Sequence, residues 1–126
     1  MRSYNKTLLL GNLAAKPEFR KTVKDNDVAT FPLAINRQFT NQETGEKTQE
    51  VDYHRIVCFG PLAKIVEQNL DKGSSILVDG RLNNRFYENQ KGEKIYTTEI
   101  VAEDINILNW KKTNNPITIE KTSNTT

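Results

Sequence analysis

The segment Val51–Phe59 constrains the fold most strongly, because it has the composition of a β-strand and a sharp end. It is rich in β-branched and aromatic residues, and Gly60 and Pro61 close it. Side chains alternate between the two faces of a strand. One face is expected to carry Val51, Tyr53, Arg55, Val57 and Phe59. The other is expected to carry Asp52, His54, Ile56 and Cys58.

Two aromatic rings with a guanidinium between them, Tyr53, Arg55 and Phe59, allow two interpretations. They suit a surface on which nucleic-acid bases stack and a phosphate is held. They equally suit a half-buried strand whose rings belong to the core. The strand by itself favours neither interpretation, so the rest of the chain has to decide.

Five other segments have the pattern of strands, and one has that of a helix. The predicted strands are Asn5–Leu13, Glu18–Lys24, Val28–Phe39, Ser75–Phe86 and Ile95–Leu108. The predicted helix is Pro61–Asp71, with an apolar face of Leu62, Ile65, Val66, Asn69 and Leu70. A tight turn is expected at Asp25–Asp27, and Pro32 argues for an edge position or a bulge. The order of elements fits an all-β OB-fold, a five- or six-stranded Greek-key barrel with one short helix.

Composition restricts the classes of protein that this chain can belong to. With 126 residues, it is expected to form one domain over residues 1–110, followed by a polar, disordered tail over residues 111–126. The net charge of +2 excludes a wholly basic coat, so a nucleic-acid ligand would need the positive charge gathered on one face. The single cysteine and the lack of a long apolar run predict a cytoplasmic protein that is not in a membrane.

A second candidate binding strand repeats the chemistry of Val51–Phe59. The side chains that share one of its faces are Arg81, Asn83, Arg85 and Tyr87. A basic and aromatic track over bound nucleic acid is favoured over a solvated face, because the same residue types recur. Phe86 points the other way and is predicted to pack. Arg37 and Phe39 lie where the third strand enters its loop, and Arg37 is equally consistent with solvated and binding roles.

No catalytic constellation is found in the sequence. His54 is the only histidine, and Cys58 stands about 13 Å away along the same strand, beyond hydrogen-bond reach. Cys58 is predicted to be a small buried hydrophobe. The chain has neither a phosphate-binding glycine motif nor a metal-ligand spacing, so we expect no cofactor, no metal site and no enzyme activity.

Several segments, in their order and spacing, resemble a known family. They are Asn5–Leu13, Pro17–Arg20, Tyr53–Gly60, Leu62–Ala63, Lys72–Ser74, Val78–Leu82 and Tyr96–Glu99. The chain is similar to bacterial-type single-stranded DNA-binding proteins over roughly residues 3 to 108. The resemblance implies base stacking on Phe39, Tyr53, Phe59 and Tyr87. Three of these, all except Phe59, stand where well-known members often have Trp, so binding per base is expected to weaken somewhat.

The resemblance also implies a homotetramer that coats single-stranded DNA in replication, recombination or repair. It places His54 in the contact between subunits. The successive leucines Leu8, Leu9 and Leu10 are more apolar edge than a monomer usually leaves bare, which predicts that the first strand takes part. The alternatives are an accessory factor of primosome type, an RNA binder and, much less favoured, a nuclease on the same barrel. Residues 115–126 have one acid and no apolar terminus, so we expect no recruitment of partners through an acidic tip. A phage or mobile-element version would fit.

Overall fold

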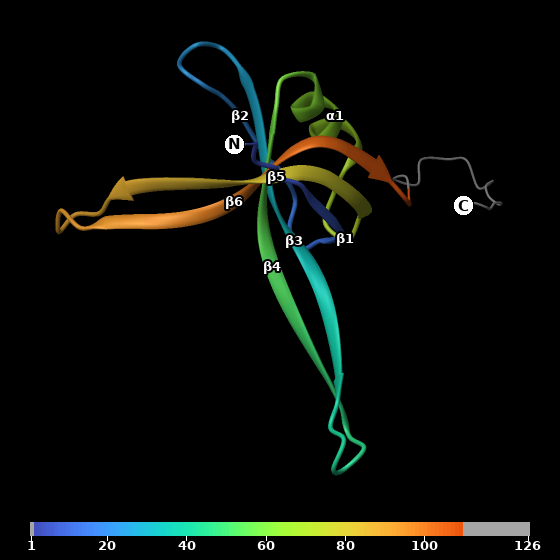
Figure 1. The fold of residues 1–126 in the computed structure, drawn as a ribbon. Helices are drawn as coiled ribbons and strands as arrows, with labels where there is room; N and C mark the ends of the chain where they lie inside the picture. The colour runs from blue at the N-terminus through green and yellow to red at the C-terminus, as the bar shows by residue number, and fades with distance from the viewer. Residues whose placement is uncertain (1, 110–126) are drawn as a thin grey trace.

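The structure is a small, mostly antiparallel β-barrel from which two long hairpins extend (Figure 1). This computed structural model describes residues 2–109. The elements are β1 (Thr7–Leu13), β2 (Glu18–Lys21), β3 (Asp27–Thr40), β4 (Lys47–Phe59), α1 (Pro61–Asn69), β5 (Ser75–Glu88) and β6 (Lys94–Ile107). The predicted all-β OB-fold is confirmed, and the predicted tail lies outside the described residues.

Five strands close the barrel, and β2 extends it at one edge. The strand order is β1-β5-β6-β4-β3-β2, and an additional pairing of β1 with β3 joins the two sides. Among the described residues, β4 and β6 are the one parallel pair. The closure depends on Gly11, where a Cβ would lie 2.3 Å from the carbonyl oxygen of Ala34. A side chain there would push β1 away from β3, so this glycine allows the close approach of two backbones.

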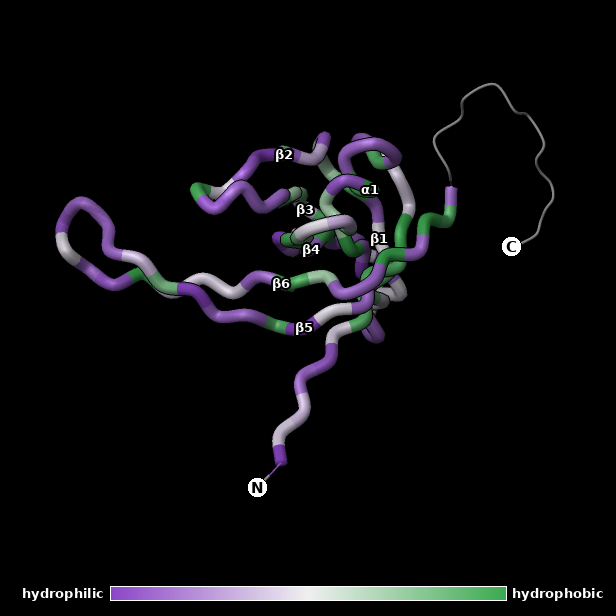
Figure 2. The backbone as a smooth tube through the Cα atoms, turned by 90° about the horizontal axis from the view of Figure 1, so that it is seen from above, coloured by the Kyte–Doolittle hydropathy of each residue, from purple (hydrophilic) through white to green (hydrophobic). Residues whose placement is uncertain are grey.

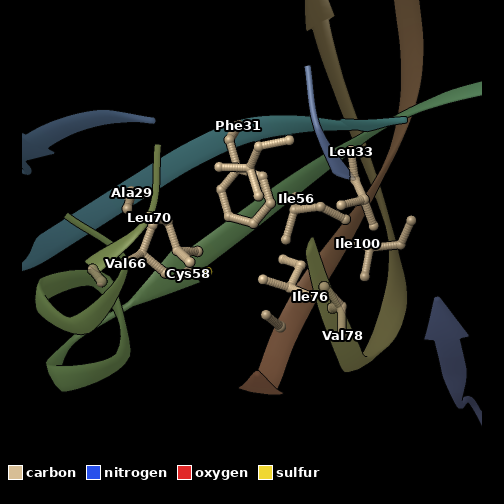
Figure 3. Close-up of a cluster of buried hydrophobic side chains, with 13 residues drawn as sticks. Ala29, Phe31, Leu33, Ile56, Cys58, Val66, Leu70, Ile76, Val78 and Ile100 are labelled. Carbon is tan, nitrogen blue, oxygen red and sulfur yellow. The ribbon is translucent and has the colours of Figure 1, made fainter. Parts of the chain in front are cut away.

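The core lies inside the barrel, where inward-facing residues of β1, β3, β4, β5 and β6 meet those of α1 (Figure 3). Phe31, Leu33 and Ile56 are almost completely buried. Cys58 is buried among them as predicted, and burial raises the pKa of its thiol from 9.0 to about 12. The thiol therefore behaves as a small hydrophobe.

Helix α1 covers one end of the core with most of the predicted face, because Leu62, Val66 and Leu70 all pack against the core. Its buried residues are Ala63 and Val66, joined by Leu70 just after its end, whereas Ile65 is exposed. The helix ends at Asn69 rather than Asp71, because Leu70 is extended. Among residues 2–109, no helix is long and apolar enough to cross a membrane.

The N-terminal strands are shorter than predicted. β1 begins at Thr7, and the side chain of Asn5 instead pairs with the backbone of Leu82. β2 ends at Lys21, because the chain turns over Thr22–Asp25, where the Asp25 amide donates to the Thr22 carbonyl. The predicted turn at Asp25–Asp27 is therefore wrong by a few residues, and Asp27 begins β3 instead.

Pro32 lies inside a strand that has partners on both sides, so the predicted edge position is wrong. It pairs with Arg55 of β4, and its carbonyl accepts from the Ala14 amide on the other side. On that side β3 pairs with β2 through Thr30 and with β1 from Leu33 onward. Pro32 occupies the gap between these two partners, where no ladder hydrogen bond needs its missing N–H.

Both long hairpins run beyond the barrel. We call residues 36–51 the β3–β4 arm and residues 82–100 the β5–β6 arm. They leave the barrel in different directions in Figure 1, and Figure 2 shows mostly hydrophilic residues around the turn of the β5–β6 arm. β4 begins at Lys47 instead of Val51, and β5 continues to Glu88, so both arms are longer than the sequence predicts.

Candidate nucleic-acid interface

The outer face of the sheet brings together the aromatic and basic residues of two strands. Val57 of β4 pairs with Val101 of β6, which pairs with Arg81 of β5, so these three residues share a face. Alternation along β4 and β5 extends that face. We call the following six residues the aromatic–basic face: Tyr53, Arg55, Phe59, Arg81, Arg85 and Tyr87.

The rings of this face are open to solvent. Tyr53 is 64% exposed, Phe59 50% and Tyr87 53%. The interpretation in which Tyr53 and Phe59 belong to the core is therefore wrong. A large ring loses stabilisation when it is left in water, so three such rings on one face need a reason.

A buried acid lies within the same face. Nε of Arg55 is 3.4 Å and Nε of Arg85 is 3.7 Å from Oε1 of Glu99, whose side chain is 5% exposed. Arg81 has a looser partner, with 3.9 Å between its Nε and Oε2 of the exposed Glu103. Sequence reasoning gave Glu99 no role and missed this position. Only the pairings of β6 with β4 and with β5 could have indicated it.

Arg37 and Phe39 lie on the opposite face of their hairpin, away from the aromatic–basic face. Arg37 pairs with Glu50 across β3 and β4, on the side of the hairpin opposite Tyr53. Its guanidinium contacts Glu50 at 2.9 Å and Asp52 at 2.7 Å, and it lies 4.8 Å from the ring centroid of Phe39. The structure therefore does not bring these two predicted site residues to the other six.

Phe86 does not pack in the interior, so its predicted role is corrected. It is 61% exposed on the other face of the β5–β6 arm from Tyr87. Its ring centroid lies 5.6 Å from that of Tyr96, and Nζ of Lys94 lies 5.9 Å from it. The barrel core ends before this point of the hairpin, so an inward direction on β5 no longer means burial.

A hollow of about 420 Å³ adjoins the aromatic–basic face. Tyr53 and Arg55 line it together with Thr30 and Pro32 of β3, and the connection between β1 and β2 borders it with Lys16. Sequence reasoning treated residues 14–17 as a plain connection. A lone lysine in a loop gave no signal that it would lie near this face.

The residues predicted for a subunit contact lie on two different strands, β1 and β4. Leu8 and Leu10 are each 60% exposed on the outer side of β1. His54 is half-buried on β4, in phase with the core residues Ile56 and Cys58. Among residues 2–109, no group of three or more His, Cys, Asp or Glu side chains is placed to hold a metal ion.

Comparisons with known proteins all point in one direction. A model of the single-strand binding protein family matches residues 4–108. The chain is 46% identical over 110 residues to a single-stranded DNA-binding protein of Staphylococcus aureus strain MRSA252, covering 87% of this chain and 69% of the relative. It is 39% identical over 117 residues to single-stranded DNA-binding protein 1 of Xylella fastidiosa strain 9a5c, covering 93% and 86%.

Solved structures show the same similarity. The Plasmodium falciparum SSB complex with ssDNA superimposes with a TM-score of 0.79 at 28% identity, covering 86% of this chain and 98% of that one. A deletion mutant of the single-stranded DNA-binding protein from Thermus aquaticus gives a TM-score of 0.72 at 31% identity, covering 84% and 51%.

Proposed function

Since the chain belongs to the single-strand binding protein family, we propose that it binds and coats single-stranded DNA with little dependence on sequence. Members of this family bind DNA and catalyse no reaction, so the chain is not an enzyme and the nuclease alternative is set aside. Strands exposed in the cytoplasm during replication, recombination or repair are the ligand that this activity serves.

The observation that carries the proposal is the aromatic–basic face. Its three exposed rings offer the flat surfaces on which successive bases stack, and stacking tolerates any base. Its arginines stand between and beside the rings, where the phosphates of a stacked strand would run. A DNA strand on this face would cross β4, β6 and β5 in turn.

Arg37 and Phe39 form a second, separate part of the proposed interface. Because they lie on the other side of the β3–β4 hairpin, a strand that reaches them from Tyr53 has to pass around the edge of the hairpin. Wrapping of this kind needs a longer strand than the aromatic–basic face alone.

The test is a titration of fluorescein-labelled oligo(dT) followed by anisotropy. Phe59→Ala is expected to lose about 1–3 kcal/mol of binding, the usual contribution of one stacked base, with folding intact. Ile65→Ala is the matched control, because Ile65 is an exposed apolar residue of α1 outside the aromatic–basic face. Unchanged affinity with a clearly lower melting temperature would make Phe59 a structural residue. Competition with oligo(U) separates DNA preference from RNA binding.

We also propose a homo-oligomer, a tetramer, with β1 in the contact. The support is the pair of exposed leucines, Leu8 and Leu10, which a solitary barrel would leave in water. Leu10→Asp is expected to shift the mass measured by light scattering toward the 14.4 kDa of one chain. A wild-type protein that sediments at 14.4 kDa at micromolar concentration would contradict the proposal.

A further inference from the structure

A carboxylate in the middle of a surface that has to bind a polyanion needs an explanation. Glu99 is 4% exposed, and its Oε1 has no hydrogen-bond partner among residues 2–109. Such a group has two unfavourable effects. It loses its hydration when the chain folds, and it repels phosphate when DNA binds. Nothing in the packing requires an acid there, because a neutral side chain of the same shape would fill the same space.

We propose that Glu99 is a positioning residue, which orients Arg55 and Arg85 for the phosphates of bound DNA. This inference rests on the proposed function of the aromatic–basic face. The evidence is that two arginines from different strands turn the same atom, Nε, toward the same carboxylate oxygen, at 3.4 and 3.7 Å. One buried charge thus fixes the direction of two side chains that are otherwise half exposed, at 46% and 50%.

The geometry of the guanidinium explains how one group can serve two partners. Its five N–H donors lie in a plane, and an arginine that faces an acid through Nε retains its terminal nitrogens for a second acceptor. An arginine that is already oriented loses less rotamer freedom when a phosphate arrives than one that moves freely in water. Two guanidiniums against one carboxylate also leave one net positive charge for the DNA.

Arg37 shows the opposite arrangement. It has two acids to itself, and Glu50 accepts a 2.9 Å hydrogen bond from its terminal Nη2. One of its terminal nitrogens and its Nε are therefore both engaged, and its charge is more than balanced. Glu99 differs because it is buried, shared and reached only through Nε.

The variant Glu99→Gln distinguishes positioning from simple charge. If Glu99 only repelled DNA, its neutralisation would add one net positive charge and tighten binding. If it positions the arginines, binding to fluorescein-labelled oligo(dT) weakens by about five- to tenfold, the scale of ordering two arginine side chains. Glu103→Gln is the matched control, since it makes the same charge change on the same strand at an exposed position beside Arg81. It is expected to leave affinity unchanged or slightly higher.

A double-mutant cycle completes the test. In a protein carrying Arg55→Ala and Arg85→Ala, the further change Glu99→Gln is expected to leave affinity unchanged or slightly higher, because the residues that Glu99 orients are gone and only the charge change remains. Circular dichroism checks that each variant is folded. If Glu99→Gln does not fold, Glu99→Asp replaces it: the charge is kept but the carboxylate is withdrawn by one methylene, and binding still weakens.

The outcomes separate the two proposals. Binding by a folded Glu99→Gln protein that equals or exceeds wild type, or an equal loss in the double-arginine background, overturns the positioning role and leaves the proposed interface intact. Wild-type affinity in the protein that lacks both arginines overturns that part of the interface itself.

Discussion

The β3–β4 arm and the β5–β6 arm carry similar residue types but use their charges differently. On the β3–β4 arm, Arg37 is held by two half-exposed acids and lies against Phe39. On the β5–β6 arm, Arg85 shares one buried acid with Arg55 of the barrel. The first set of ion pairs lies within one hairpin, whereas the second links the β5–β6 arm to the barrel. The same kinds of side chain therefore give a fully balanced patch in one place and, in the other, two arginines that share a single acid.

The largest expected effect separates the two arms by their rings. Tyr87→Ala is expected to lose about 1–3 kcal/mol of binding to a short oligo(dT) of about eight nucleotides, because such a strand covers only the aromatic–basic face. Phe39→Ala is expected to change that affinity by less than about 0.5 kcal/mol, the scale of an ordinary surface substitution. With an oligonucleotide several times longer, Phe39→Ala should also weaken binding. Anisotropy titrations measure all of these, and equal losses on the short strand would remove the distinction between the arms.

A smaller effect separates the arms by their charges. Replacing Arg55 and Arg81 by Ala is expected to reduce the slope of log K against log salt by about 1.4, or roughly 0.7 for each phosphate contact. Arg37→Ala, measured on the same short oligo(dT), is the control, and the slope should stay near that of wild type, because this strand does not reach Arg37 and the two acids already balance its guanidinium. Titrations over a range of NaCl concentrations give both slopes. A flattened slope for Arg37→Ala would show that the ion pairs open when DNA binds.

The smallest effect concerns the second face of the β5–β6 arm. Phe86→Ala is expected to lower the free energy of unfolding by about 0.5–1.5 kcal/mol, the contribution of an aromatic pair, since Phe86 contacts Tyr96 but is mostly in water. A phenylalanine in a core would lose about 3–5 kcal/mol. Urea denaturation at a fixed protein concentration measures the difference. A loss in the upper range would mean that another surface covers Phe86 in solution.

Local pattern was enough to predict most of the barrel. Alternation along Val28–Phe39 puts Phe31 and Leu33 on one face, and alternation along Val51–Phe59 puts Ile56 on the face opposite Tyr53 and Arg55; the structure buries Phe31, Leu33 and Ile56. Alternation cannot say where a core ends. Phe86 continues the inward phase of β5 beyond the barrel, so the same rule that places Val78 in the core predicts the wrong environment for Phe86.

Which residues meet at the interface depends on the register of neighbouring strands. Register is a relation between two strands, so the pattern within one strand does not reveal it. Phe39 pairs with Thr48 and Arg37 with Glu50, so odd-numbered residues of β3 face the same side as even-numbered residues of β4. This relation is set by the length of the loop at 41–46, which no periodicity gives. The meeting of Arg55, Arg85 and Glu99 likewise follows from a parallel pairing of β4 with β6, strands that are far apart in the sequence.

The junction of β1 with β3, where Gly11 allows the two backbones to approach closely, determines where this barrel can open. β1 is in register with β5 over Thr7–Asn12, but with β3 over only Asn12 and Leu13. The pairing of β1 with β3 is the shorter of the two, so it has fewer ladder hydrogen bonds to break. Local opening is therefore expected to begin between β1 and β3, with α1 and the β5–β6 pairing still formed. If β1 separates from β3, the edge of β1 that faced β3 is uncovered, and a free strand edge accepts a strand from another molecule. Backbone proximity at one glycine therefore also protects the chain against strand exchange.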